Sequence, residues 1–193
     1  VFPKERDGEI CVSEAVVKYP TERKIFNLDE IKIYLIYNGI NIQESVKISN
    51  HIDKSLTTVI NPESLIIGSL GRLSVQKGYP YLIEAMKIVS NKINDVKLLI
   101  VGDGELKEEL FELTKNLKMD DHISFLGLKT NVPSIIKNFD IFVLSSLWEG
   151  LPTVVMEAMV CSVPVIATDI PGTRELIEDG ENGFLVKPRD SFD

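Results

Sequence analysis

Short apolar runs alternate with longer amphipathic segments along most of the chain from residue 64 onward. The runs carry almost no polar positions, which is typical of strands buried on both faces. The segments between them place apolar residues at helical spacing. We predict strands at 65–70, 96–101, 123–126, 140–144, 163–168 and 183–186, and helices at 81–89, 105–117 and 132–138, with a short helix after Pro171.

Apolar strands separated by helices indicate a parallel sheet covered on both faces, which is a Rossmann-like, doubly wound α/β fold. The first 60 residues do not follow this rhythm. Residues 9–18 predict a strand entering a helix, residues 31–37 a second strand, and the polar stretch 41–62 an irregular linker. We therefore divide the chain into residues 1–62 and a main domain at 63–193.

The net charge of the chain limits the classes of partner that it can bind. A formal net charge of −8 disfavours nucleic acid, because phosphate contacts need clustered Lys and Arg. Any anion must be captured locally by a few cations and backbone amides. His51, His122 and the two cysteines lack metal-ligand spacing, so we expect no metal site.

The ends and the hydropathy of the chain suggest where the protein works. No apolar run approaches the ~20 residues that a membrane span needs, and the start V-F-P-K-E-R-D-G lacks a signal-peptide pattern. We expect a cytoplasmic protein. Because the chain starts with Val1 and not with Met, we also expect it to be a fragment.

Four unusual loops follow predicted strands, at 71–78, 102–104, 145–152 and 168–172. In an open parallel sheet, ligands bind outside the carboxyl ends of the strands. We therefore expect these loops to meet at one edge of the sheet and to form the functional site there.

The first two loops are rich in glycine. G-R-L-S-V-Q-K-G places Arg72 and Lys77 between glycines, which suits close approach to a diphosphate and charge-assisted bonds to it. The alternative is a pair of solvated loop cations. In V-G-D-G-E-L-K, Lys107 replaces the third glycine of a dinucleotide-binding fingerprint, so a tight turn serving the next helix explains that loop equally well.

The third loop contains the stretch S-S-L-W-E-G-L-P-T-V-V-M-E-A-M. Pro152 suits the first turn of a helix, where a missing amide hydrogen costs nothing. Amides just before and within that turn would face an anion at the positive helix terminus. These amides belong to Gly150, Leu151 and Thr153.

Two acids flank this turn, Glu149 before the helix and Glu157 within it. If the helix were regular between them, their backbones would lie about 12 Å apart along the axis. That distance exceeds the ~5–9.5 Å of carboxylate pairs that share acid/base work on one bond. It suits two contacts on one elongated ligand, and the alternative is a helix cap and a solvent-facing acid.

These loops, in this order, resemble the nucleotide-sugar-binding half of GT-B glycosyltransferases, specifically the retaining glycosyltransferase family 4. The resemblance covers residues 64–186 almost continuously, and C-V-S-E-A-V-V-K and I-Y-N-G-I resemble the last strands of that family's N-terminal domain. The segments that carry it are I-G-S-L-G-R-L-S-V-Q-K-G-Y-P-Y-L-I-E-A, L-L-I-V-G-D-G-E-L, I-S-F-L-G, S-S-L-W-E-G-L-P-T-V-V-M-E-A-M and P-V-I-A-T-D-I-P-G-T-R-E-L-I-E-D-G-E-N-G.

The resemblance implies a role for each matching residue. Arg72 and Lys77 would bind the diphosphate of the donor and stabilise the departing nucleotide. Glu149 would contact the transferred sugar, and Glu157 would bind the ribose hydroxyls. The backbone at 127–132 would line the base. The implied donor-binding set also includes Gly71, Gly102, Gly104, Gly127, Gly150, Leu151 and Thr153.

The resemblance also implies an activity. The protein would be a metal-independent, cofactor-free hexosyltransferase that moves a sugar from a UDP-, GDP- or ADP-linked donor to a glycan, lipid-linked or small-molecule acceptor. Polysaccharide biosynthesis in the cytoplasm, or at the inner face of the membrane, would be its setting. The chain matches only the tail of the N-terminal acceptor domain and lacks the family's C-terminal helix. We therefore expect it to bind donor weakly and not to catalyse transfer.

Two alternatives to this function remain, and the sequence departs from the family pattern at one position. The chain could be a non-catalytic interaction module of the same fold, or a relative of nucleotide-sugar epimerases. Where the family usually reads A-C-G-x-P, this chain has V-C-S-V-P. Ser162 thus replaces a helix-ending glycine, which costs stability if that position has a positive φ.

Overall fold

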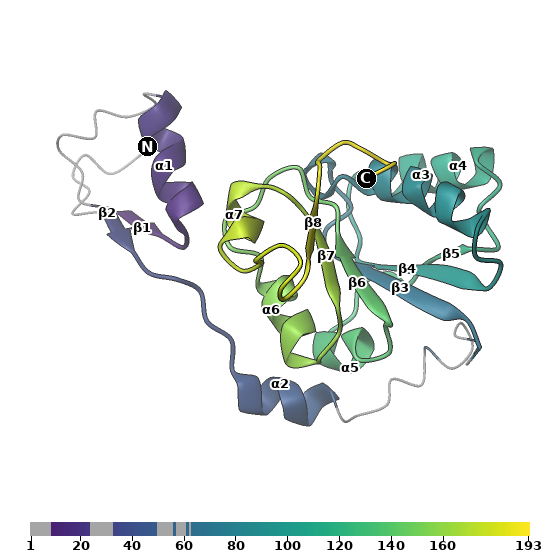
Figure 1. The fold of residues 1–193 in the computed structure, drawn as a ribbon, viewed down its shortest axis with the longest axis horizontal. Helices are drawn as coiled ribbons and strands as arrows, with labels where there is room; N and C mark the ends of the chain where they lie inside the picture. The colour runs from purple at the N-terminus through teal and green to yellow at the C-terminus, as the bar shows by residue number, and fades with distance from the viewer. Residues whose placement is uncertain (1–8, 24–32, 50–55, 57–60, 62) are drawn as a thin grey trace.

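Six parallel strands form the central sheet of the structure, a computed structural model that describes residues 9–23, 33–49, 56, 61 and 63–193 (Figure 1). Their order across the sheet is β5-β4-β3-β6-β7-β8. All six lie where the apolar runs predict them, but β7 starts two residues late, after Pro164, which has no amide hydrogen to donate. The strands are β3 (Leu65–Leu70), β4 (Val96–Val101), β5 (Ile123–Phe125), β6 (Ile141–Leu144), β7 (Val165–Thr168) and β8 (Phe184–Val186).

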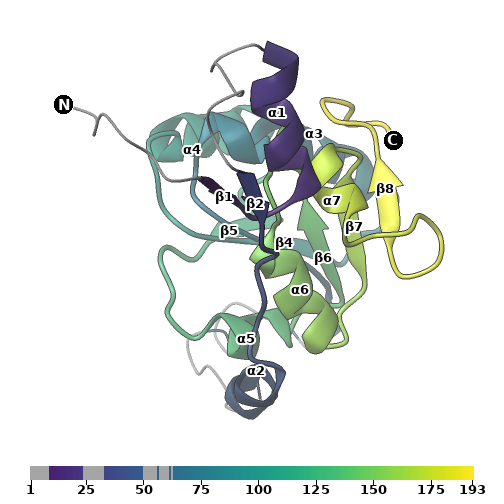
Figure 2. The ribbon, with the colours of Figure 1, turned by 90° about the vertical axis from the view of Figure 1, so that its left-hand side faces the viewer.

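Helices cover both faces of this sheet (Figures 1 and 2). Strand β4 shows why, since its buried residues alternate between two cores: Leu98 and Ile100 pack with α3 and α4, whereas Leu99 and Val101 pack with α5 and α6. The prediction of a doubly wound α/β fold is confirmed. The helices are α3 (Tyr79–Ser90), α4 (Lys107–Asn116), α5 (Val132–Ile136), α6 (Thr153–Val160) and α7 (Pro171–Arg174), with a 3₁₀ turn, η2, at Val75–Lys77.

The strand order contains one reversal. From β3 the chain moves outward through β4 to β5, then crosses back and continues outward from β6 on the other side of β3. The loops that leave β3 and β6 therefore diverge at the carboxyl edge of the sheet. In open α/β sheets, this is the place where a ligand crevice forms.

The N-terminal part lies beside the main sheet (Figure 1). It consists of β1 (Glu9–Cys11), which pairs in parallel with β2 (Ile33–Leu35), and of helix α1 (Glu14–Arg23). The predicted strand at 31–37 is confirmed at its centre, and residues 31 and 32 lie outside the described residues. Helix α1 is held to the main domain by Glu175, whose carboxylate accepts hydrogen bonds from the amides of Glu14 (3.1 Å) and Ala15 (3.0 Å).

The prediction of an irregular linker at 41–62 is wrong for its first half, because Ile42–Ser49 forms helix α2. The amide of Glu44 donates to the Asn41 side chain at 3.1 Å, which satisfies one of the free donors at the helix start. The small side chains of Ser45 and Ser49 are buried, and α2 packs against α5. Polar serines at the contact positions hide this packing in the sequence. Residues 50–55, 57–60 and 62 lie outside the described part.

Helices α4 and α6 end in the same way. At the end of α6, the amide of Ser162 donates to the carbonyl of Met159 and that of Val163 to the carbonyl of Ala158, both at 3.0 Å. This pattern requires a left-handed residue after the helix. Ser162 supplies it with φ 58°, as Lys118 does after α4. The concern raised by the missing glycine is therefore justified: Ser162 carries backbone strain.

Candidate functional site

The loops that follow β3, β4, β6 and β7 meet at the carboxyl edge of the sheet, as the sequence predicts. The amide of Leu73, after β3, donates to the carbonyl of Asp103 after β4 at 3.0 Å. The amide of Leu147, after β6, donates to the carbonyl of Gln76 at 2.7 Å. Thr168, at the end of β7, donates its hydroxyl to a carbonyl of the loop after β6. The loop after β3 thus contacts the loops after β4 and β6, which lie on either side of it.

Glycine is required where the first two loops approach one another. Gly102 has φ 144°, and a Cβ on it would lie 1.9 Å from the carbonyl oxygen of Gly71. A Cβ on Gly104 would lie 2.4 Å from the carbonyl oxygen of Leu73. Gly102 also donates its amide to the carbonyl of Gly127 at 2.9 Å. The same glycines line a surface cavity between these loops, where backbone can approach a ligand closely.

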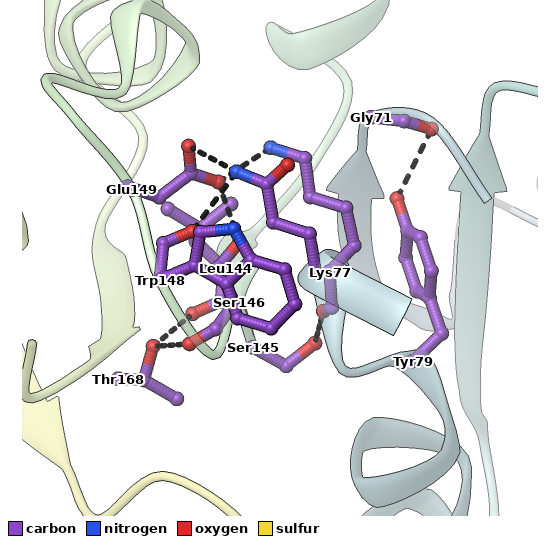
Figure 3. A network of polar contacts seen from close by, with 10 residues as sticks. Gly71, Lys77, Tyr79, Leu144, Ser145, Ser146, Trp148, Glu149 and Thr168 are labelled. Atoms are coloured by element: carbon purple, nitrogen blue, oxygen red, sulfur yellow. Dashed lines mark hydrogen bonds and ion pairs between the residues drawn. The ribbon is translucent and has the colours of Figure 1, made fainter. Parts of the chain in front are cut away.

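A largely buried ion pair joins the loop after β3 to the loop after β6 (Figure 3). The Lys77 ammonium lies 2.6 Å from Oε1 of Glu149, and the two side chains are only 15% and 10% exposed. The same oxygen accepts a hydrogen bond from Oγ of Ser146 at 2.7 Å. The other carboxylate oxygen accepts from Nε2 of Gln76 at 3.2 Å. Glu149 is therefore held by one cation and two neutral donors.

Further hydrogen bonds tie the loop after β3 to the loop after β6 (Figure 3). Ser145 donates its hydroxyl to the carbonyl of Lys77 at 2.8 Å, and Gln76 donates to the carbonyl of Trp148 at 2.9 Å. The buried hydroxyl of Thr168 donates to the carbonyl of Ser146. These contacts fix the backbone on both sides of the ion pair, so the positions of Lys77 and its partner carboxylate are set by the fold.

Arg72 is not part of this network. Its guanidinium lies 3.1 Å from Glu105, and both side chains are more than half exposed. The residue lines the same surface cavity as Gly71, Gly102 and Gly104. An exposed ion pair of this kind is weak, so Arg72 can turn toward an anion at little cost. The two predicted cations therefore share one edge of the sheet but differ in burial.

Glu157 lies in α6, the helix that begins next to the ion pair. It is partly buried, and this burial raises the pKa of its carboxyl above the ordinary value. One turn later, burial and the charge of Glu157 raise the pKa of the Cys161 thiol. A carboxylate in such a place gains most from ligand groups that donate hydrogen bonds to it.

The other predicted residues form the approach to α6. Pro152 precedes the helix in an extended conformation, and Thr153 is its first residue. Leu151 is buried, whereas Gly150 is partly exposed. A Cβ on Gly150 would lie 3.1 Å from a methyl group of Val16, so the N-terminal part borders this loop.

The geometry assumed for the two acids needs correction. Helix α6 begins at Thr153, so Glu149 lies in the preceding loop and the axial distance of a regular helix does not apply. Glu149 is not a helix cap either, because Pro152 occupies the N-cap position and the Glu149 carboxylate accepts bonds from the ion-pair network. Nor does Glu157 face solvent fully. The extended backbone of Pro152 breaks the regular spacing.

Sequence reasoning missed Gln76, Ser146 and Trp148. Gln76 stands next to Lys77 in the glycine-bounded loop, so its position pointed to the site. Its hydrogen-bond partners lie 72 and 73 residues away in the sequence, and its role was therefore not visible there. Ser146 is fully buried, whereas Trp148 is 52% exposed. Within the described ranges, the His, Cys, Asp and Glu residues form no group that could hold a metal ion. Among the helices described, none is long and apolar enough to cross a membrane.

Known proteins are similar to this chain in sequence. The family model of glycosyl transferases group 1 matches residues 53–193. A UDP-Gal:α-D-GlcNAc-diphosphoundecaprenol α-1,3-galactosyltransferase of Escherichia coli is 33% identical over 188 residues, covering 95% of this chain and 46% of that protein. An uncharacterized glycosyltransferase of Methanocaldococcus jannaschii is 38% identical over 172 residues, covering 81% and 42%. The chain thus spans less than half the length of these relatives.

Solved structures agree with this assignment. The Anabaena protein HepE, crystallised with UDP-glucose, superposes with a TM-score of 0.81 at 28% identity, over 97% of this chain and 52% of that one. The TarM protein of S. aureus, in a complex containing UDP, superposes with a TM-score of 0.79 at 26% identity, over 96% and 35%. By its family model, its relatives and its GT-B-type fold, the chain belongs to the glycosyl transferases group 1 family.

Proposed function

We propose that this chain is the nucleotide-sugar-binding half of a retaining glycosyltransferase of family 4. The observation that carries the proposal is the Lys77–Glu149 ion pair, because it lies where the strand order reverses and where α6 begins. A diphosphate bound there would meet a cation and helix amides, while a carboxylate stays beside it for a sugar hydroxyl.

The donor would be a nucleotide-diphospho-sugar. The S. aureus structure contains UDP and the Anabaena structure UDP-glucose, so UDP is the first nucleotide to test, with GDP and ADP as alternatives. Glu157 would accept hydrogen bonds from the ribose hydroxyls, which would supply donors to a carboxylate that burial penalises. The backbone that starts at Gly127 would line the base.

The cations would act on the leaving group. During transfer, the bond between the anomeric carbon and the diphosphate oxygen breaks, and the acceptor oxygen bonds to the same face of that carbon. The acceptor proton ends on the diphosphate. Negative charge therefore develops beside Lys77, and Arg72 would turn from Glu105 to share it. We propose that these groups and the α6 amides are sufficient without a metal ion.

The acceptor would be a glycan, a lipid-linked sugar or a small molecule. Two relatives bear names with a diphospho-undecaprenol acceptor, the galactosyltransferase of Escherichia coli and an N-acetylgalactosaminyltransferase of Campylobacter jejuni. A lipid-linked acceptor at the inner face of the membrane, in polysaccharide assembly, fits these names. The part of the longer relatives that this chain does not match would provide the acceptor pocket.

Calorimetric titration of the chain with UDP, GDP and ADP tests the proposal. We expect one nucleotide to bind, and Glu157→Ala to weaken its affinity about tenfold, the equivalent of a lost hydrogen bond to a charged group. Glu112→Ala, at an exposed position of α4, should leave the affinity unchanged. If no nucleotide binds while the fold is intact, the chain is an interaction module; equal affinity in Glu157→Ala would refute the ribose role.

A further inference from the structure

Gln76 is the residue that joins the backbone and side chains of the two crevice loops most extensively. Its carbonyl accepts the amide of Leu147 at 2.7 Å. Its side-chain nitrogen donates to the carbonyl of Trp148 at 2.9 Å and to Oε2 of Glu149 at 3.2 Å. A carbonyl can only accept hydrogen bonds, and so can an ionised carboxylate, so the amide nitrogen must face both. The orientation of Gln76 is therefore determined by its partners.

This contact matters because Lys77 has two potential partners. In the present structure the Lys77 ammonium is bound to Glu149. A diphosphate at the start of α6 would compete with that carboxylate for the same cation. Once Lys77 turns away, Glu149 keeps an almost buried negative charge, which is costly unless other donors face it.

When Lys77 turns away, two neutral donors remain, and each binds a different oxygen of the Glu149 carboxylate. Ser146, labelled in Figure 3, donates to Oε1 at 2.7 Å, and Gln76 donates to Oε2 at 3.2 Å. Neither depends on the cation. Ser146 is itself anchored by Thr168 through its carbonyl. The carboxylate can therefore stay in place and in orientation while its cation is exchanged.

We propose that Gln76 is a positioning residue that keeps the Glu149 carboxylate aimed at the transferred sugar when Lys77 moves to the diphosphate. The inference rests on the proposed function and adds a residue to it. It predicts that loss of the Gln76 side chain affects recognition of the sugar more than recognition of the nucleotide. A residue that only holds the loops together would affect both equally.

Gln76→Glu tests the contact without any ligand. It places a second carboxylate within hydrogen-bond distance of Glu149, and Lys77 can neutralise only one of them. Burial, and to a smaller extent the charge of Glu149, raises the pKa of Tyr79, so its hydroxyl stays neutral in this range. Two adjacent carboxylates bind a proton more tightly in the folded state, so stability is lost as pH rises through that raised pKa.

The measurement is the melting temperature of the chain between pH 5 and pH 8. Relative to the wild type, Gln76→Glu should lose on the order of 4 °C more at pH 8 than at pH 5. Gln43→Glu, which adds the same charge at an exposed position of α2, should show no such trend. A Gln76→Glu curve parallel to that of Gln43→Glu would overturn the contact and the proposal with it.

Calorimetry with UDP and UDP-glucose tests the role itself. In Gln76→Ala the affinity for UDP should stay within about twofold of the wild type, whereas the affinity for UDP-glucose should fall about tenfold. Equal losses for both probes would show a merely structural residue and overturn the proposal. If the wild type binds none of UDP, GDP and ADP, the proposed function fails and the positioning role fails with it, while the melting series still reports on the Gln76–Glu149 contact. If it prefers GDP or ADP, the same comparison is made with that nucleotide and its glucose derivative.

Discussion

Breaking the Lys77–Glu149 ion pair tests whether the fold itself builds this site. We expect Lys77→Met to destabilise the chain because it leaves an uncompensated charge at a position only 10% exposed. Glu149→Gln leaves the ammonium, 15% exposed, beside an amide. The double variant removes both charges, so it should cost much less than the two single variants together.

The structure sets the size of this effect. Removing one partner of a buried pair typically costs about 3–5 kcal/mol. Glu149 retains the hydrogen bonds from Ser146 and Gln76, so we place each single variant at the lower end, about 3 kcal/mol. The double variant leaves no uncompensated charge, so we place it at about 3 kcal/mol or less, which makes the coupling energy about 3 kcal/mol or more.

Urea unfolding of the four proteins, followed by circular dichroism, measures this coupling. The chain offers a matched control in Arg72 and Glu105, whose contact is 3.1 Å long but whose side chains are 74% and 52% exposed. For Arg72→Met, Glu105→Gln and their double variant, we expect a coupling energy of about 0.2–1 kcal/mol. If the two cycles give the same coupling energy, the burial of Lys77 and Glu149 does not strengthen their interaction and the reasoning is refuted.

Two further predictions concern α6. Burial raises the pKa of Glu157, so its ionisation destabilises the folded chain as pH rises from the ordinary pKa of 4.5 through the raised one. The melting temperature of Glu157→Gln should therefore match that of the wild type at pH 4 and exceed it at pH 7.5. The control Glu112→Gln, at an exposed position, should show no such trend. Ser162→Gly should stabilise the chain by about 1 kcal/mol in urea unfolding, because glycine removes the strain at φ 58°. Ser90→Gly, at the end of α3, should destabilise it, and stabilisation by both variants would contradict the strain argument.

The sequence was sufficient for the sheet because its strands are buried on both faces. Continuous apolar runs such as 96–101 have few alternatives to a central parallel strand, and β4 is found at those residues. Helix α2 was missed for the opposite reason. Its stability depends on a cap at Asn41 and on small buried serines against α5, and neither produces an apolar pattern.

The meeting of the four loops was predictable because parallel strands bring their carboxyl ends to one edge. What each side chain contacts was not predictable, since partners such as Lys77 and Glu149 lie 72 residues apart. Local rules suggested a helix cap or a regular helical spacing for the acid. The position of Glu149 is set by the extended backbone at Pro152 and by the crossing from β5 to β6. Both are properties of the tertiary fold.

The paired state of Lys77 changes how affinity for an anion should be understood in this chain. With a net charge of −8, the protein as a whole repels a diphosphate, and its most buried site cation is already neutralised by Glu149. Binding is therefore an exchange of one anionic partner of Lys77 for another. A simple count of cations would overestimate the affinity of the site for an anion. The exchange is favourable only if Glu149 keeps its place without the cation, and the donors that allow this, Ser146 and Gln76, are uncharged residues that no charge pattern in the sequence would reveal.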